Sequence, residues 1–334
     1  MNREHEPTRF LHVEDLTVQY TSGGEIIHAV TGVSFSLERG KTLALVGETG
    51  AGKTTIARAI LRILPDRAAR VAGGKVELEG TDLLQLSEKE MQKIRGRRIS
   101  MVFQDPMTAL NPIMRIGDQV AEVIREHNKI SRKEARNRAM DILELVGIQQ
   151  DRFYNYPHEF SGGMKQRVVI AMALACNPEL LLADEPTTAL DVTIQAQVIA
   201  MIRELRDKFN TAMILITHDL GVVANVADEV AVIYAGNILE YGPQKALYKN
   251  PRHPYTLALF NAIPTLEGET ERLENITGFP PDPTAPPPGC CFASRCKFCT
   301  PECTQNIPPV VEFEPGHYCR CFHSDLTRGE VDHG

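Results

Sequence analysis

Alternating apolar and polar residues near the start of the chain predict half-buried strands at residues 11–20 and 29–37. Continuous apolar runs further along indicate buried strands. These runs lie at 43–46, 99–103, 180–184 and 212–216, and further strands are expected at 73–84, 230–235 and 237–241. Helical periodicity or helix-like composition predicts helices at 56–64, 87–95, 116–126, 131–146, 161–176 and 194–208. Strands and helices in this order predict an α/β fold.

Polar residues support the ends of two of these helices. Ser87 with Glu90, and Ser131 with Glu134, form the Ser-x-x-Glu pattern in which the two side chains cap the first turn of a helix. Gly147 follows the second of these helices and supplies its stop, because glycine readily adopts the left-handed conformation that ends a helix.

A glycine-rich loop lies between the apolar run at 43–46 and the helix predicted at 56–64. Its pattern, G-x-x-x-x-G-K-[ST], lets converging backbone N–H groups bind phosphate oxygens, and the helix N-terminus adds about half a positive charge. We expect Lys53 to reach the β- and γ-phosphates, Thr54 to hold Mg²⁺ and Thr55 to help hold the α-phosphate. The loop consists of Gly47, Glu48, Thr49, Gly50, Ala51, Gly52, Lys53, Thr54 and Thr55.

Two carboxylates at the end of the run at 180–184 suggest the other half of a nucleotide site. Asp184 ends a buried strand, which is where enzymes with a phosphate loop place an Mg²⁺ ligand. Glu185 is next to it and could deprotonate a water that attacks the γ-phosphate. His218, at the tip of the strand 212–216, could hydrogen-bond the same phosphate, although a structural role is the more common one for such a histidine.

Two further positions have both a functional and a structural interpretation. Tyr20 falls at the end of a predicted strand, where it could stack on a nucleotide base or simply pack as a strand-end aromatic. Ser161 is expected to cap a helix, and Gly162 and Gly163 behind it leave helix N–H groups open to an anion. A capped helix without a ligand is the alternative.

The composition, 43% hydrophobic and 24% charged over 334 residues, allows one large globular domain with an extension, or two domains. A net charge of −7 argues against a nucleic-acid-binding face, which needs clustered Lys and Arg. The longest apolar run, 168–176, is too short to span a bilayer, and the first residues show no signal segment. We therefore expect a cytosolic chain that reaches a membrane only through proteins embedded there.

Cysteines are concentrated near the C-terminus. Cys176 stands alone in an apolar helix and is expected in the core, whereas the other seven of the eight lie between Cys290 and Cys321. In a cytosolic chain this clustering favours a metal site over disulfides. Four thiolates suit a [4Fe–4S] cluster or tetrahedral Zn²⁺, and spacing alone slightly favours Zn²⁺. The proline-rich stretch 278–289 before them is not expected to form helix or strand.

Together and in this order, these motifs resemble those of ABC-type ATPases over residues 10–262. The resemblance implies a P-loop nucleotide-binding domain with a RecA-like core, an antiparallel β subdomain and an α-helical subdomain. It places this domain at 8–262, with the helical subdomain at about 105–178, and a Cys-rich extension at 263–334. The matching segments are Walker A (47–54), the Q-loop residue Gln104, the signature (161–163), Walker B (180–184), the catalytic Glu185, the D-loop (189–191) and the switch residue His218.

The resemblance also implies individual roles. Tyr20 matches the adenine-stacking aromatic, and Gln104 would join Thr54 and Asp184 around Mg²⁺. The signature residues and the D-loop residue would act at a shared site, where the signature covers the nucleotide of a second ATPase subunit. They are Ser161, Gly162, Gly163 and Asp191. Met164 stands where the family usually has Gln, and we assign it no nucleotide contact.

Longer segments resemble the ATPase subunits of dipeptide and oligopeptide importers. They are FQDPMTALNP at 103–112, FSGGM at 160–164 and NPRHPYT at 250–256. The tail resembles that of the D-type subunit, whose extension can hold a [4Fe–4S] cluster, and this reverses the preference for Zn²⁺. Matching by position implies the ligands Cys290, Cys296, Cys303 and Cys321. Cys291, Cys299 and Cys319 exceed that pattern, and Cys296 and Cys299 are themselves spaced like metal ligands.

A D-type subunit implies a heterodimer with an F-type ATPase subunit, bound beneath two transmembrane permease subunits and supplied by an extracytoplasmic substrate-binding protein. The chain alone should then hydrolyse ATP slowly, and its helical segment would contact the permeases. Dipeptides and oligopeptides are the implied cargo, with nickel, glutathione or another small solute as alternatives. A soluble ABC ATPase of repair or translation with a zinc module is a further alternative, disfavoured because the chain shows neither a basic stripe nor a long coiled-coil insertion.

Overall fold

The computed structural model describes residues 10–188, 190–261 and 276–325. Its contacts divide the chain into two compact units. Of the described residues, the first unit comprises 10, 37–42, 85–188 and 190–216, and the second comprises 11–36, 43–84, 217–261 and 276–325. The division expected from the resemblance, 8–262 and 263–334, stays a prediction, because its boundaries lie outside the described residues.

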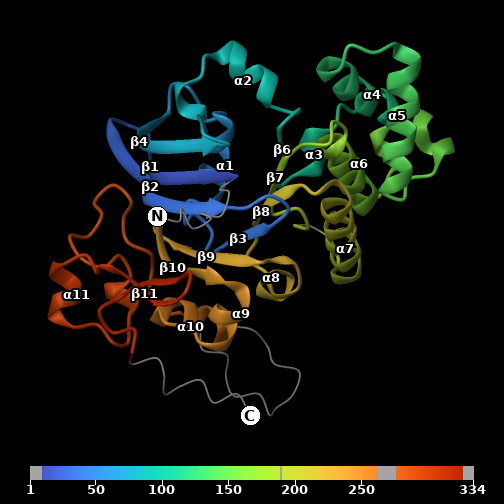
Figure 1. Cartoon of the computed structure of the whole chain (residues 1–334). Helices are drawn as coiled ribbons and strands as arrows, with labels where there is room; N and C mark the ends of the chain where they lie inside the picture. The colour runs from blue at the N-terminus through green and yellow to red at the C-terminus, as the bar shows by residue number, and fades with distance from the viewer. Residues whose placement is uncertain (1–9, 189, 262–275, 326–334) are drawn as a thin grey trace, which may run out of the picture. The chain divides into compact units, whose positions relative to one another are not determined.

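Parallel strands form the sheet of the first unit. Strands β6 (Ile99–Val102), β7 (Leu180–Asp184) and β8 (Ala212–Ile216) lie in the spatial order β8–β7–β6 (Figure 1). Every residue of the three strands is buried, as their apolar runs predicted. Because the strands are parallel, their carboxyl ends share one edge of the sheet, and the residues that follow them meet there.

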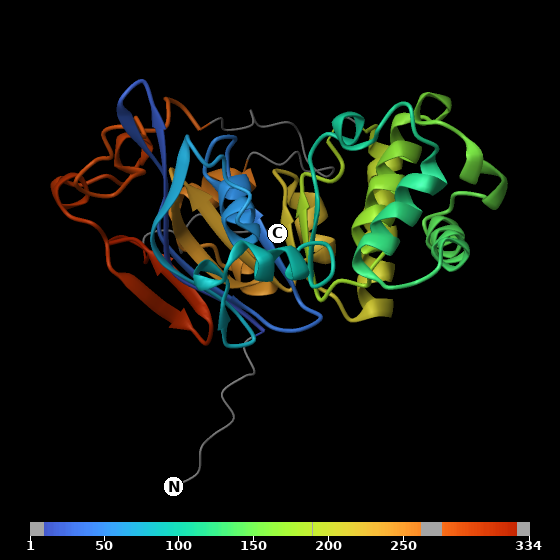
Figure 2. The same cartoon turned by 90° about the horizontal axis from the view of Figure 1, so that it is seen from above.

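Helices of the first unit pack against one another beside this sheet. Helices α4 (Ile116–His127) and α5 (Arg132–Leu145) lie side by side and both contact α6 (Gly162–Leu174), as the green helices of Figures 1 and 2 show. The apolar residues at helical spacing in α4 and α5 become buried, and in α4 Gly117 and Gln119 are buried with them. The unit also contains α2 (Glu88–Ile94), α3 (Pro106–Ala109), η2 (Gln150–Tyr154), η3 (Pro157–Glu159) and α7 (Val192–Phe209).

The predicted helix caps are present. The carboxylate of Glu90 accepts hydrogen bonds from Ser87 N at 2.8 Å and Ser87 Oγ at 2.7 Å. Ser131 Oγ accepts from Glu134 N at 3.2 Å, and Gly147 follows α5 with a left-handed φ of 77°. Local sequence therefore sets the ends of these helices.

Cys176 differs from its prediction. Helix α6 ends at Leu174, so Cys176 follows the helix and is half-buried rather than part of the core. Its Sγ lies 3.8 Å from Asn128 Nδ2. The helix stops early because Asn177 adopts a left-handed φ of 50° immediately before Pro178, and a proline disfavours helical backbone in the residue before it.

The second unit contains an antiparallel sheet and the strand that leads into the glycine-rich loop. In the antiparallel sheet, β1 (Leu11–Ser22) lies between β2 (Glu25–Leu37) and β4 (Ala69–Leu78). In the other sheet, β3 (Thr42–Val46) pairs in parallel with β9 (Glu229–Tyr234). The other elements are α1 (Lys53–Leu61), β5 (Thr81–Asp82), η1 (Leu83–Gln85), α8 (Leu220–Val226), β10 (Asn237–Pro243), α9 (Gln244–Lys249) and α10 (Pro254–Asn261).

The strand predicted at 73–84 is wrong at both ends. Strand β4 begins earlier, at Ala69, and stops at Leu78. Glu79 and Gly80 then form a tight turn with φ values of 50° and 77°, after which the chain reverses into β5. A turn that uses a non-glycine residue at positive φ is hard to recognise in a sequence, which explains the error.

The C-terminal extension adds strands to the sheet of the second unit. Strand β12 (His317–Arg320) pairs antiparallel with β10, and β11 (Val310–Glu314) pairs with β12. These strands were not predicted. The described part of the proline-rich stretch, 278–289, forms neither helix nor strand, as predicted, and it leads to η4 (Ala293–Arg295) and α11 (Pro301–Gln305).

An aromatic cluster and a buried carboxylate join this extension to the rest of the unit. The ring of Phe292 lies 5.3 Å, centroid to centroid, from both Tyr234 and Tyr255. The fully buried carboxylate of Glu240 accepts hydrogen bonds from Arg252 N at 2.8 Å and His253 N at 2.9 Å. His317 Nε2 lies 2.8 Å from the same carboxylate, so β10 and β12 are linked through a satisfied buried charge.

His253 should make stability depend on pH. Burial lowers the pKa of its imidazole to about 3, and its Nδ1 accepts a hydrogen bond from Tyr255 N at 3.0 Å. In the unfolded chain this imidazole titrates near pH 6.5, so between pH 6.5 and pH 3 the unfolded state binds more protons than the folded state. Acidification from pH 8 to pH 5 should therefore lower the free energy of unfolding by about 2 kcal/mol through this residue.

Urea unfolding of the wild type and of His253→Asn at pH 8 and pH 5 measures this effect. The asparagine Oδ1 can still accept from Tyr255 N but does not titrate in this range. The variant should lose less stability than the wild type on acidification, and equal losses would contradict the assignment.

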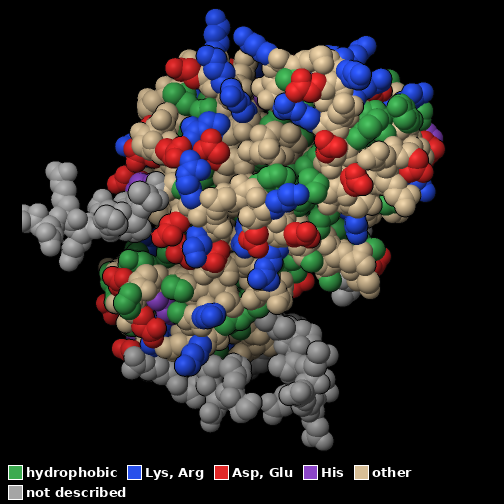
Figure 3. Space-filling model, turned by 45° about the vertical axis from the view of Figure 1, so that its right-hand side comes forward, with side chains coloured by type: hydrophobic (Ala, Val, Ile, Leu, Met, Phe, Trp, Pro, Cys, Tyr) green, Lys and Arg blue, Asp and Glu red, His purple; other side chains and the backbone are tan. Residues whose placement is uncertain are grey.

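Charged side chains of both signs are mixed on the face drawn in Figure 3, where Lys and Arg lie among Asp and Glu over the described residues. The surface seen there is therefore mixed rather than basic. No helix in the described part of the chain combines the length and the hydropathy that a membrane-spanning segment needs.

Candidate nucleotide-binding and hydrolysis site

The glycine-rich loop joins β3 to α1, and the helix begins at Lys53 with Gly52 as its N-cap at a φ of 102°. Gly47 also has a positive φ, 149°, and a Cβ there would collide with the carbonyl oxygen of Ile233. A Cβ at Gly52 would collide with the carbonyl oxygen of Ala29. Glycine is therefore required at both positions, because the loop backbone lies directly against its neighbours.

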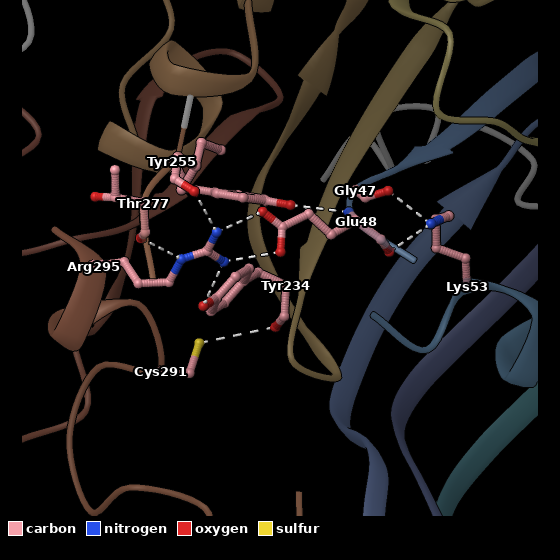
Figure 4. Close-up of polar contacts among 9 residues, drawn as sticks. Gly47, Glu48, Lys53, Tyr234, Tyr255, Thr277, Cys291 and Arg295 are labelled. Carbon is pink, nitrogen blue, oxygen red and sulfur yellow. Dashed lines mark hydrogen bonds and ion pairs between the residues drawn. The ribbon is translucent and has the colours of Figure 1, made fainter. Parts of the chain in front are cut away.

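Lys53 is buried within this loop. Its Nζ donates hydrogen bonds to Gly47 O at 2.7 Å and to Glu48 O at 2.8 Å (Figure 4). The hydroxyl of Tyr20 lies 3.4 Å from Thr55 Oγ1 at the start of α1. The second unit thus brings the predicted base-stacking residue to the helix that follows the phosphate loop.

In the first unit, the residues that follow β6 and β7 meet at the shared edge of the sheet. Gln104 Nε2 donates to Glu185 Oε2 at 2.9 Å, and Thr188 Oγ1 donates to the same oxygen at 2.8 Å. Glu185 has a φ of 45°, which is uncommon for a residue other than glycine and occurs often at functional sites. The sequence resemblance predicted that Gln104 lies at the Mg²⁺ ion. In the structure Gln104 is hydrogen-bonded to Glu185, the predicted catalytic base.

The same unit contains Asp184, directly before Glu185 in the sequence, and Asp191, which directly precedes the next helix. Asp184 is the last residue of β7 and is 2% exposed, as expected of a carboxylate delivered by a buried strand. Asp191 caps α7, with its Oδ1 accepting from Ile194 N at 3.0 Å. Of the three D-loop residues, only the one at position 189 lies outside the described residues.

The signature residues begin α6. Ser161 Oγ accepts from Met164 N at 3.4 Å, so the predicted cap is present. Ser161 and Gly162 are exposed. A Cβ at Gly163 would lie 2.7 Å from Ile194 Cγ2, so this glycine has a packing role on α7 in addition to its predicted nucleotide role. His218 follows β8 by two residues and is exposed.

The cysteines of the extension lie near one another. Burial, and after it the neighbouring thiols, raise the pKa of Cys321 to about 12, and the thiols that act on it are those of Cys290, Cys296 and Cys303. Burial raises the pKa of Cys296 to about 11, with Cys290, Cys299 and Cys303 contributing in the same direction. Within residues 10–188, 190–261 and 276–325, however, no three His, Cys, Asp or Glu side chains are already arranged to hold a metal ion.

Sequence reasoning gave no role to Arg295, and it did not anticipate that Tyr255 contacts the phosphate loop. The guanidinium of Arg295 binds both carboxylate oxygens of Glu48, at 2.8 and 3.0 Å (Figure 4). Glu48 N donates to Tyr255 Oη at 3.0 Å. The only sequence feature that draws attention to Arg295 is its position directly before Cys296, a predicted metal ligand. This position does not reveal that Glu48 is the partner of Arg295.

A lysine held at the end of a phosphate loop, in a chain that also has a buried Asp followed by Glu, defines a nucleoside triphosphatase of the P-loop class. The family described as "ABC transporter" matches residues 30–188. The ATP-binding cassette MJ0796, solved as a dimer bound to ADP and Pi, superposes with a TM-score of 0.63 at 27% identity, over 70% of this chain and 98% of that chain. The fold is that of an ABC ATPase cassette, as predicted.

Relatives that align with nearly the whole chain identify the family within this class of ATPases. The chain is 50% identical to the oligopeptide transport ATP-binding protein OppD of Bacillus subtilis (strain 168), covering 97% of this chain and 92% of the relative. It is 48% identical to the dipeptide transport ATP-binding protein DppD of the same strain, covering 95% of each. It belongs to the family of ATP-binding proteins of oligopeptide and dipeptide ABC transporters.

Two consequences follow from this membership. The chain is an ABC-type ATPase, for which ATP and Mg²⁺ are the expected cofactors. The family described as "Oligopeptide/dipeptide transporter, C-terminal region" matches residues 239–303, so part of the extension is a family feature as well. The resemblance to the ATPase subunits of dipeptide and oligopeptide importers is therefore confirmed.

Proposed function

We propose that this chain hydrolyses ATP to energise an importer of dipeptides or oligopeptides. The proposal of ATP hydrolysis rests on the carboxylate of Glu185, which follows β7 and accepts hydrogen bonds from Gln104 and Thr188. The peptide cargo is supported by the relatives, whose names are those of oligopeptide and dipeptide transport proteins, and by the match of residues 239–303. Import of nickel, glutathione or another small solute is the alternative.

In the proposed mechanism, backbone N–H groups from Gly50 to Thr55 bind the phosphates, and Lys53, oriented by the carbonyls of Gly47 and Glu48, binds the β- and γ-phosphates. Tyr20 stacks on the adenine. Glu185 accepts the proton of the attacking water, and His218 hydrogen-bonds the γ-phosphate. Lys53 and the loop N–H groups stabilise the charge that develops during transfer.

Mg²⁺, when bound, would neutralise charge on the β- and γ-phosphates. The residues that would hold it are Thr54, Asp184 and Gln104. A hydroxyl, a carboxylate and an amide provide the oxygen ligands that this hard cation prefers. The burial of Asp184, and the place of Gln104 beside Glu185, support this assignment.

We propose that the partners are a second, F-type ATPase subunit, two transmembrane permease subunits and an extracytoplasmic substrate-binding protein. The exposed signature residues Ser161 and Gly162, with Gly163 and Asp191, would act on the ATP of the second ATPase subunit. The helices between about 105 and 178 would contact the permeases. The chain would then work at the cytoplasmic face of the membrane, attached through those subunits.

We also propose that Cys290, Cys296, Cys303 and Cys321 hold a [4Fe–4S] cluster, with Zn²⁺ as the alternative. The support is the clustering of cysteines in the sequence and the proximity of these thiols, since Cys290, Cys296 and Cys303 each add to the burial that raises the pKa of Cys321. Their side chains must rearrange on binding, which is common because metal sites are rarely complete without the metal. The bound group would help to fold an extension whose proline-rich part has few apolar residues to bury.

Purification and reconstitution test the proposed transport function. A tagged chain should be recovered from detergent-solubilised membranes together with permease subunits, and proteoliposomes of that complex with its binding protein should take up di- or oligopeptides only when ATP is supplied. Uptake of nickel or glutathione without uptake of peptides would contradict the proposed peptide cargo and support the alternative. Recovery of ribosomes or DNA in place of permeases would favour a soluble ABC ATPase.

A further inference from the structure

The guanidinium of Arg295 uses all its N–H groups in hydrogen bonds, and two of these bonds link the Cys-rich extension to Glu48 of the phosphate loop. Nη1 and Nη2 bind the two carboxylate oxygens of Glu48, and Nη1 also donates to Tyr234 Oη at 3.1 Å. Nη2 and Nε donate to the backbone oxygens of Ile276 and Thr277, at 3.0 and 3.1 Å. The side chain is only 5% exposed, so a fully satisfied charge is buried at this junction.

Glu48, the second residue of the loop, is held at three of its groups. Arg295 binds its carboxylate, Tyr255 Oη accepts from its N–H at 3.0 Å, and its carbonyl accepts from Lys53 Nζ at 2.8 Å. Figure 4 shows these contacts as one continuous chain from Arg295 through Glu48 to Lys53. A displacement of Glu48 would therefore move one of the two carbonyls that orient the phosphate-binding lysine.

Next to this contact, a cavity lies between part of the loop and the extension. This cavity of about 460 Å³ has residues 49–51 of the loop on one side and residues 280–283, Cys290 and Cys291 of the extension on the other. The charged contact through Glu48 is thus a discrete link between the loop and the extension. Arg295 directly precedes Cys296, so this link begins at the cysteine-bearing segment.

The ion pair between Arg295 and Glu48 also changes the charge of the phosphate loop. The Glu48 side chain is 27% exposed and carries a negative charge in a loop built to bind a triphosphate. Paired with a guanidinium, this charge is neutralised. Without Arg295, an uncompensated carboxylate in the loop would repel the polyanionic nucleotide.

We propose that Arg295 is a positioning residue for nucleotide binding. It neutralises Glu48 and, through Glu48, orients Lys53, so that the affinity for ATP depends on the folded Cys-rich extension. This inference rests on the proposed ATPase function of the same loop. It adds a residue outside the ATPase motifs to the machinery that binds nucleotide.

Equilibrium binding of a fluorescent ATP analogue to the full-length chain tests the proposal. Arg295→Met, which keeps most of the side-chain volume, should weaken binding about tenfold, and the loss should shrink as salt screens the partly exposed carboxylate of Glu48. Glu48→Gln should cost less than about threefold. The double variant Arg295→Met/Glu48→Gln should bind better than Arg295→Met alone, because the unpaired charge is gone.

Lys297→Gln is the matched control, because it removes an exposed cation two residues away on the same segment, and it should bind as the wild type does. In the assembled complex, Arg295→Met should raise the KM for ATP about tenfold and change kcat less than about twofold. If Arg295→Met does not fold, Arg295→Lys, which keeps the charge but not the forked geometry, should show an intermediate loss.

Wild-type affinity in Arg295→Met, or a double variant no better than Arg295→Met, would overturn the proposal: the pair would then only anchor the extension. Failure of the wild type itself to bind the ATP analogue would instead contradict the proposed ATPase function. The two failures are therefore distinguishable.

Discussion

Replacing Glu185 with glutamine should lower ATP hydrolysis at least a hundredfold while leaving ATP binding close to that of the wild type. Glutamine has nearly the same volume, and its Oε1 can still accept the hydrogen bonds that Gln104 and Thr188 give to the carboxylate. It cannot accept the proton of the attacking water. Binding should therefore survive, because the loop that holds the phosphates belongs to a different segment of the chain.

The measurement compares ATP affinity and phosphate release for the wild type and Glu185→Gln in the assembled complex, where the shared sites are complete. Glu204→Gln is a matched control, because Glu204 is an exposed glutamate of α7, and its activity should equal that of the wild type. Phosphate release within a few-fold of wild type in Glu185→Gln would remove Glu185 from the role of base.

Replacing Cys303 or Cys321 with serine should abolish metal binding by the extension. Each change removes one of four proposed thiolate ligands, and a hydroxyl is a poor substitute for a thiolate on iron or zinc. Because the bound group would help to fold this segment, hydrogen exchange of the described residues after about 280 should become faster. ATP should still bind, at the reduced affinity that a loosened Arg295 implies.

Anaerobic purification followed by visible absorbance and by iron, sulfide and zinc analysis of one sample provides the readout. About four irons and four sulfides in the wild type would support the cluster, and one zinc without iron would support the alternative. Cys299→Ser is the control, because Cys299 is exposed and lies outside the proposed ligand set, and it should keep its metal. Unchanged metal content in both Cys303→Ser and Cys321→Ser would rule out the ligand set.

The sequence by itself determined the class of protein and the places of its functional loops. The phosphate loop, the helix caps and the apolar strands each depend on residues a few positions apart, so their physical causes can be read locally. Glycines at 47 and 52 are required because the backbone there adopts positive φ against neighbouring carbonyls. The buried strand that ends in Asp184 could be recognised from its own apolar residues alone.

Tertiary structure alone decided how distant polar residues pair. Arg295 and Glu48 are 247 residues apart, and His317 and Glu240 are 77 apart. Neither pair could be predicted, because a charged residue looks the same in a sequence whether water or a buried partner satisfies it. Strand β11 was missed for a related reason: its residues are mostly exposed, and it is a strand because β12 supplies its hydrogen bonds. The motifs of the ATPase are local, but the link between them and the extension is made only by the fold.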